Sequence, residues 1–344
     1  MRIETLDTAD DARLRQAYDL HRRAHLLGRE GRPFWSWEEM RGEFRTADPG
    51  ERLVVLGGYA APDGEQAVTA APGTLLGIAY VWLPLLDNLD KAWLSVDVDP
   101  AHAQRGVGTQ LAGALVELCR AEGRREVLGE VKIPFSERET HGYRRFAERL
   151  GATFSNVEVV RYLELPVPGE RVEQWAATAA ERAGGYTIET HVDVVPDELV
   201  PSLCVLLGQL GVDAPTGAVD WEEEVMTPDR FLTLRAELVA AGRTMLETVA
   251  LTPEREVVAQ STLAVPVTGR TDVSQWGTFV HREHRGHRLG LAVKAAALRH
   301  LQEHHPDMRR IVTQNAETND HMVAINELMG FEPVETSTEM LLRL

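Results

Sequence analysis

The chain has 344 residues, of which 44% are hydrophobic and 26% charged, a composition typical of folded protein with room for two domains. Its formal net charge of −17 repels phosphate and so argues against nucleic acid as a partner; it favours a cationic substrate such as an amine, or serves solubility alone. No apolar run in the sequence reaches the ~20 residues needed to cross a membrane, and no export signal follows Met1, so we expect a cytoplasmic protein without a membrane partner. Cys119 and Cys204 fall in apolar helical patterns and are expected to be buried thiols.

The first half of the chain has helical spacing from Thr8 to Leu26, and Ser36 opens a second short helix with Glu39 at capping-box distance. Aliphatic and β-branched runs separated by Gly, Pro and Asp turns predict strands after these helices. The predicted elements that follow are strands Leu53–Tyr59, Leu75–Leu83 and Ala92–Val98, helix Gly108–Ala121, strand Glu126–Ile133, helix Gly142–Leu150 and strand Val157–Leu165.

Pro166, Pro168 and Gly169 interrupt this pattern, and a short Ala-rich helix, Val172–Ala183, then ends at Gly184. We therefore predict a connector at 169–185 between an N-terminal domain, 1–168, and a C-terminal domain, 186–344. The second domain is expected to contain strand Tyr186–Val192, helices Asp197–Leu210 and Pro228–Ala241, strands Thr244–Leu251, Val257–Val265 and Ser274–Val280, helix Leu289–His304, strand Arg310–Gln314, helix Asp320–Met329 and a last strand near Glu339–Leu344.

The order of elements in the second half repeats that of the first. Val98 precedes Gly108 by ten residues, and Val280 precedes Gly290 by ten, so the two copies are offset by 182 residues. At the later helix stops, Gly151 and Gly330, the offset is 179, a drift that changes in loop length explain. The sequence therefore predicts a duplicated domain.

Each copy places a basic, glycine-containing turn after a hydrophobic strand and before a helix. Glycines let the backbone approach a ligand closely, and the helix N-terminus adds partial positive charge, so a pyrophosphate is the natural occupant. Arg105, Arg285 and Arg288 can add further charge. A dinucleotide-binding fingerprint would follow the first strand of a βαβ unit, and a Walker-type P-loop requires Gly-Lys-Ser/Thr, so neither pattern fits.

These turns resemble the Arg/Gln-x-x-Gly-x-Gly/Ala signature of the GNAT superfamily of N-acyltransferases, whose backbone amides hold the acyl-coenzyme A pyrophosphate. The first copy matches at Gly106 and Gly108, with Ala103 in the leading place, whereas the second has Arg285 and Gly290 but Arg288 where the middle glycine is expected. The resemblance implies an α/β (α+β) protein of two tandem GNAT-like domains, as in mycothiol synthase, each a mostly antiparallel splayed sheet with helices on both faces. It also implies acetyl-CoA as co-substrate and no metal.

In the family, the strand residues before the turn pair with the pantetheine arm, and an Asn near the last helix contacts the cofactor. Asn319 best fits that role, and the first copy has no equivalent Asn, so we expect the second domain to be the catalytic one. Gly290→Glu should then abolish activity while Gly108→Glu costs much less. The cofactor-binding residues that the resemblance implies are Val98, Arg105, Gly106, Val107, Gly108 and Thr109 in the first copy and Phe279, Val280, Arg285, Gly286, His287, Arg288, Leu289, Gly290 and Asn319 in the second.

The usual proton-handling residues of the family are missing. Its Tyr acid corresponds to Ala147 and Asn326, and its Glu base to Ala92 and Ser274. Asn326 can hydrogen-bond the substrate but cannot protonate it. The acidic loop from Asp213 to Glu224 could supply a base or be a solvated run of charge; its acidic members are Asp213, Asp220, Glu222, Glu223 and Glu224, and we name Glu223, Glu224 and Asn326 as candidate catalytic residues.

Several other residues near the second turn allow two interpretations. His281, His284 and His287 could serve as bases, but they lie on the cofactor side of the turn, so we expect them to contact the cofactor or solvent. Their spacing does not predict a metal site, since no carboxylate pair joins them in a ligand pattern. Three aromatic residues could line an acceptor pocket or belong to the core: Trp221, Trp276 and Phe279.

The sequence predicts an enzyme, a monomer or homodimer, that moves an acetyl group from acetyl-CoA to a primary amine of a small molecule. Two alternatives stay open. One is a non-catalytic acyl-CoA-binding sensor, and the other is an acetyltransferase for protein or peptide amines.

Overall fold

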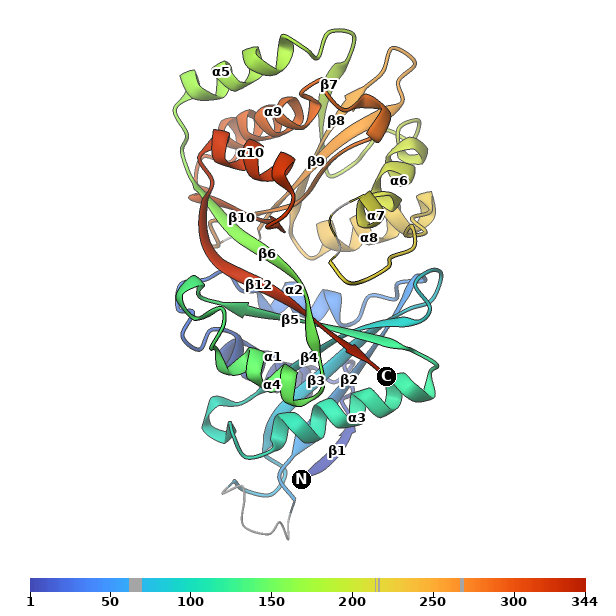
Figure 1. Cartoon of the computed structure of the whole chain (residues 1–344), viewed down its shortest axis with the longest axis vertical. Coiled ribbons are helices and arrows are strands. Elements are labelled where there is room, and N and C mark those ends of the chain that lie inside the picture. The colour runs from blue at the N-terminus through green and yellow to red at the C-terminus, as the bar shows by residue number, and fades with distance from the viewer. Residues whose placement is uncertain (62–69, 214, 216, 267–268) are drawn as a thin grey trace. The chain divides into compact units, whose positions relative to one another are not determined.

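The computed structural model describes residues 1–61, 70–213, 215, 217–266 and 269–344, and these form two compact units. Unit 1 comprises Met1–Val131, Glu139–Ser155 and Glu339–Leu344, and unit 2 comprises Lys132–Arg138 and Asn156–Thr338. Figure 1 labels most elements of both units and colours the chain from the N-terminus to the C-terminus.

Unit 1 is built on a mostly antiparallel sheet with strand order β1-β2-β3-β4-β5. Neighbours from β1 to β4 pair antiparallel, whereas β4 and β5 are parallel and are joined by a helical crossover. Its elements are β1 (Arg2–Thr5), α1 (Asp11–His25), α2 (Trp37–Glu43), β2 (Glu51–Tyr59), β3 (Leu75–Pro84), β4 (Lys91–Val98), the 3₁₀ turn η1 (Pro100–His102), α3 (Val107–Ala121), β5 (Glu126–Ile133) and α4 (Gly142–Arg149).

Helices cover both faces of this sheet because the strands alternate apolar side chains to either side. Leu111 and Leu115 of α3 pack with Leu76 on one face, and Leu14 of α1 packs with Ile78 on the other. Two cores thus hold one sheet between two helical layers, the arrangement expected from the sequence.

Unit 2 repeats this plan with strand order β6-β11-β10-β9-β8-β7, in which β10 and β11 are the parallel pair. Its elements are η2 (Phe135–Glu137), β6 (Thr153–Glu164), α5 (Gly169–Ala180), β7 (Thr187–Val192), α6 (Val200–Gly208), α7 (Leu210–Asp213), α8 (Pro228–Ala240), β8 (Thr244–Leu251), β9 (Val257–Val265), β10 (Asp272–Val280), the 3₁₀ turn η3 (Arg282–His284), α9 (Leu289–His304), β11 (Arg310–Ala316), α10 (Asp320–Met329) and β12 (Glu332–Arg343).

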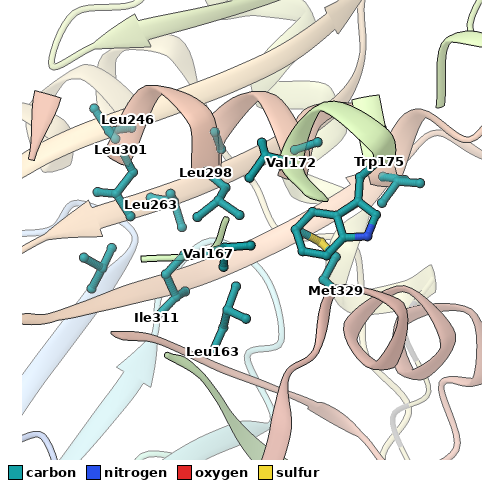
Figure 2. Close-up of a cluster of buried hydrophobic side chains, with 14 of the residues drawn as sticks. Leu163, Val167, Val172, Trp175, Leu246, Leu263, Leu298, Leu301, Ile311 and Met329 are labelled. Atoms are coloured by element: carbon teal, nitrogen blue, oxygen red, sulfur yellow. The ribbon is translucent and has the colours of Figure 1, made fainter. Parts of the chain in front are cut away.

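The segment predicted as a connector belongs to the core of unit 2. Val172 and Trp175 of α5 pack against Leu298 of α9 and against Met329, as Figure 2 shows. Trp175 is 4% exposed, so α5 buries an apolar face of the kind that a free linker would leave in water.

The compact units also differ from the predicted domains at their closing strands. Residues 339–344 belong to unit 1, where the Leu344 amide donates to the Arg125 carbonyl oxygen at 2.8 Å. Most of β6 belongs to unit 2, where it pairs antiparallel with β11 from Glu158 to Glu164. Each closing strand is therefore divided between the units, with residues 339–343 of β12 in unit 1 and residues 156–164 of β6 in unit 2, so boundaries at 168 and 186 do not separate the units.

The predicted helices and strands are otherwise confirmed to within a few residues. Ser36 and Glu39 form the expected capping box, with hydrogen bonds of 3.1 and 2.6 Å, and both cysteines are buried free thiols. The sequence analysis missed β1, and β12 begins at Glu332 rather than near Glu339. Among the helices of the described residues, none has both the length and the apolar composition needed to cross a membrane.

Candidate functional site

The parallel strands of unit 1 separate after a short stretch of pairing. β4 and β5 are in register only from Lys91 to Trp93, opposite Glu126 to Leu128, and β4 then continues to Val98 paired with β3 alone. A backbone edge of β4 is thereby left open beside the glycine turn, where an extended ligand can add as a strand.

Unit 2 opens at the corresponding place. β10 pairs with β11 only from Asp272 to Ser274, and it then runs to Val280 along β9 with a bulge between Gln275 and Gly277. Both copies therefore place an open strand edge directly before a turn and a helix N-terminus.

The backbone of the first turn is set by two left-handed residues. Asp99 caps η1, and Gln104 and Gly106 follow with φ values of 58° and 79° before α3 begins at Val107. The alternation of left-handed and ordinary residues turns the amides toward one side, which together with the helix N-terminus forms an anion-binding concavity.

The second turn has the same backbone with the glycine at the other left-handed position. Gly286 and Arg288 have φ values of 85° and 55°, and they stand 182 residues after Gln104 and Gly106. Arg288 therefore adopts the conformation that the motif's middle glycine would supply, at a cost of roughly 1–2 kcal/mol for a residue with a Cβ. The departure from the signature leaves the main-chain path unchanged.

Both turns leave space for a ligand at their surface. A Cβ on Gly106 would meet only Gln110 Nε2, at 3.8 Å, and one on Gly286 would meet nothing within 4 Å. Exposed backbone at a helix N-terminus can hold a phosphate-bearing ligand, and the open strand edge can hold an extended chain.

The arginines of the second turn are held by carboxylates of the same unit. Asp213 accepts from Arg282 at 2.7 Å and from Arg285 at 2.9 Å, while Arg288 donates to Glu181 at 2.6 Å. Arg288 also donates to the Thr178 carbonyl oxygen at 2.6 Å. Their charge is thus compensated within the protein before any anion arrives.

The comparison with protein families finds that residues 14–151, from α1 to the end of α4, match the acetyltransferase (GNAT) family. The chain contains a GNAT acetyltransferase domain. That domain corresponds to most of unit 1, and no match was found among curated proteins.

Solved GNAT structures show that the tandem fold extends over the whole chain. The tandem GNAT protein from the clavulanic acid biosynthesis pathway, solved without AcCoA, is 23% identical with a TM-score of 0.74, and the match covers 99% of this chain and 98% of that one. A GCN5-related N-acetyltransferase from Sphaerobacter thermophilus is 16% identical with a TM-score of 0.63, covering 99% and 95%. A glucosamine N-acetyltransferase region of a fungal multidomain β-N-acetylglucosaminidase is 14% identical with a TM-score of 0.67, covering 99% of this chain and 38% of that one. At such identities the likeness shows the fold.

The three candidate catalytic residues of unit 2 lie in different places and have different contacts. Asn326 is fully buried and donates to Asn315 Oδ1 at 2.9 Å, and its own Oδ1 has no partner among the described residues. Glu224 accepts from Arg230 at 2.8 Å, and its amide donates to the Gly208 carbonyl oxygen, so it ties the acidic loop to α6 and α8. Glu223 is exposed on the same loop, of which residues 214 and 216 lie outside the described part of the chain.

The other residues predicted around the second turn have structural contacts. Asn319 caps α10 by accepting from the Met322 amide at 3.2 Å. His287 hydrogen-bonds the Arg182 carbonyl oxygen and His284 hydrogen-bonds the Tyr186 hydroxyl, so both contact the segment after α5. Trp276 is 49% exposed at the bulge of β10, with Arg243 over its ring at 5.2 Å.

The first unit contains a polar cluster that the sequence analysis missed. His21 of α1 and Asp97 of β4 are joined by a 2.8 Å hydrogen bond between Nδ1 and Oδ2, although they are 76 residues apart. Burial, and after it the negative charge of Asp97, raises the pKa of the nearby Tyr143 phenol on α4, so Tyr143 keeps its proton at neutral pH. This cluster adjoins the open edge of β4.

The corresponding place in unit 2 is apolar. Phe279 stands 182 residues after Asp97, is 7% exposed and packs with Leu203 and Phe231 in the core under α6 and α8. A polar pair in one copy and a packed phenylalanine in the other are the main chemical difference between the two openings.

A signal for the pair existed in the sequence. His21 falls at helical spacing with Leu14, Ala17 and Tyr18, on the face that the structure buries, and Asp97 is an acidic residue near the end of a predicted strand. A histidine on a buried helix face and a carboxylate within a strand both require partners, and pairing them would have been a defined hypothesis.

Proposed function

We propose that the protein transfers an acetyl group from acetyl-CoA to the primary amine of a small molecule, with unit 1 as the working domain. The observation that carries this proposal is the open edge of β4 leading into the Gln104–Gly106 turn and the N-terminus of α3. The GNAT family match supports it, since it covers this domain.

The choice of unit 1 reverses the division of labour expected from the sequence. That expectation rested on Asn319 and Arg285, which are engaged with the Met322 amide and with Asp213. Unit 1 combines an exposed Gly106 with a polar cluster next to the open strand edge. Unit 2 then serves mainly as a scaffold that completes the fold.

Glutamate substitutions at two equivalent positions test which turn holds the cofactor. Arg105 and His287 occupy the same register, and both are exposed, so glutamate at either place should leave folding intact. We expect Arg105→Glu to raise the KM for acetyl-CoA at least tenfold through repulsion of the pyrophosphate, and His287→Glu to change it less than twofold.

The assay is release of free thiol from acetyl-CoA with a panel of primary amines, together with calorimetric binding of coenzyme A. The opposite ranking of the two variants would return the working site to unit 2. Tight coenzyme A binding without thiol release for any amine would favour the acyl-CoA sensor.

A further inference from the structure

We propose that His21 is the general base that accepts the proton of the attacking amine and that Asp97 positions its ring. This inference rests on the proposed acyl transfer in unit 1 and adds the group that the family's usual positions lack. Ala92 and Ala147 occupy those positions in this unit, so a proton acceptor must come from elsewhere.

The hydrogen bond between the two side chains fixes the state of the imidazole. Asp97 Oδ2 lies 2.8 Å from His21 Nδ1, which makes Nδ1 the protonated nitrogen of the neutral ring and leaves the lone pair on Nε2. Among the described residues, none hydrogen-bonds Nε2, and this atom is not completely buried. The basic nitrogen is therefore available to a substrate.

Aromatic rings enclose the imidazole on several sides. The ring of Phe34 lies 4.9 Å from that of His21, and those of His25, Tyr80 and Trp35 lie 5.7, 6.0 and 6.4 Å away. His21 is only 6% exposed, so few water molecules compete with an amine for Nε2. The aromatic faces also favour binding of a cationic ammonium, which must first lose one proton to solvent to expose the attacking lone pair.

The charged and titratable groups around the ring come from four elements and from the loop after α1. β4 supplies Asp97, α1 supplies His25, and Arg29 lies in the loop that follows. Burial raises the pKa of the phenols of Tyr80 on β3 and Tyr143 on α4, so both stay neutral. Among the described residues, the carboxylate that contacts the imidazole is that of Asp97, and it would stabilise the imidazolium formed in the reaction.

Asp97 of the pair lies on the stretch of β4 that pairs with β3 and not with β5. Asp97 directly precedes Val98, the last residue of β4. Ser95 lies two residues before Asp97 on the same face of the strand, and it hydrogen-bonds the Tyr80 side chain. A thioester arm that paired with the open edge of this stretch would lie next to the strand that holds Asp97, the partner of His21.

The step balances without a further co-reactant except water. The amine lone pair attacks the thioester carbonyl carbon, so a C–N bond forms and the C–S bond breaks, and Nε2 takes the proton released from nitrogen. Coenzyme A leaves as the thiolate, which takes up a proton from water, and His21 returns its proton to solvent.

The His21–Asp97 pair could instead have a purely structural role, as a hydrogen bond that joins α1 to β4. A matched control variant separates this structural role from the catalytic one. Arg23 ties the same helix to Asp99, just beyond the same strand, at 2.6 Å on the surface. Arg23→Gln breaks that tie without touching the pair, so it should leave kcat within twofold of the parent.

The test compares His21→Gln and the isosteric Asp97→Asn with this control. We expect His21→Gln to lower kcat at least 100-fold while the Kd for coenzyme A changes less than twofold. Asp97→Asn should lower kcat about tenfold or more and move the acidic limb of the kcat/KM–pH profile to lower pH, because the imidazolium loses its anionic partner.

The results with the two variants and with the parent protein decide between these interpretations. A folded His21→Gln protein with parental kcat, or an Asp97→Asn profile with an unshifted acidic limb, would overturn the role of the pair while leaving acyl transfer in place. Failure of the parent to bind coenzyme A would instead overturn the proposed function. Should His21→Gln not fold, Asp97→Asn and its pH profile still give the answer.

Discussion

The turns before α3 and α9 share one backbone conformation and show how single residues set it. Gly106 and Arg288 both stand in the left-handed region immediately before a helix, although only one is a glycine. Arg288 is held there by Glu181 and the Thr178 carbonyl oxygen, contacts that offset the strain of its Cβ. Gly106 needs no such contacts, because a residue without a Cβ adopts the left-handed conformation without strain.

This contrast predicts different costs for two alanine substitutions in the first turn. Gly106→Ala should lower the free energy of unfolding by about 1 kcal/mol because alanine is strained at φ 79°. At Gly108 a Cβ would lie 3.3 Å from Val98 and 3.4 Å from Phe146, and small shifts of these side chains can accommodate it, so Gly108→Ala should cost a few tenths of a kcal/mol. Urea unfolding monitored by circular dichroism gives both values, and equal costs would contradict the account of the turn.

At the scale of elements, α3 and α9 are equivalent helices in different surroundings. α9 is covered by α5, and its Lys294 is 2% exposed, with Nζ 2.6 Å from Gln275 Oε1 and 4.7 Å from the centre of the Phe331 ring. Burial lowers the pKa of Lys294 to about 7. The buried amine thus loses its charge near neutral pH, whereas in the unfolded chain it keeps the charge up to about pH 10.

The stability of unit 2 should therefore depend on pH through Lys294. Between pH 7 and 10 Lys294 is protonated in the unfolded state and not in the folded state. The free energy of unfolding therefore rises with pH, by up to about 1.4 kcal/mol per pH unit. The contribution is complete above the unfolded pKa and is lost as pH falls toward 7. Urea unfolding of the parent and of Lys294→Met from pH 7 to 9 measures this slope, which the variant should lack; parallel curves would show that Lys294 is charged when buried.

At the scale of the whole molecule, each compact unit contains part of a strand from the other half of the sequence. Leu341 is 1% exposed, and its carbonyl oxygen accepts from the Thr153 hydroxyl at 3.3 Å, both within unit 1. Leu342 and Leu344 pack against the core under α3. The C-terminus of the chain is thus part of the fold of its first domain.

Deletion of residues 339–344 should accordingly destabilise unit 1, although these residues are the farthest from it in sequence. Loss of a buried leucine costs about 2–5 kcal/mol, so amides of β5 and α3 should exchange faster with deuterium while those of α9 stay protected. Trp175→Ala is the reciprocal control, because it removes a core side chain of α5 and should accelerate exchange in α9 instead. Faster exchange in α9 after the deletion, with α3 unchanged, would contradict the assignment of the strand.

The sequence by itself determined the duplication, the order of nearly all elements and the position of both turns. These features depend on local signals: periodicity of apolar residues, the Ser36 cap, and residues that tolerate a left-handed backbone before a helix. Only the tertiary structure decided which unit receives each closing strand, that Asp213 holds Arg285, and that His21 meets Asp97. Those pairs lie some 70 or more residues apart, and no local pattern selects one distant partner over another; packing of the whole unit does.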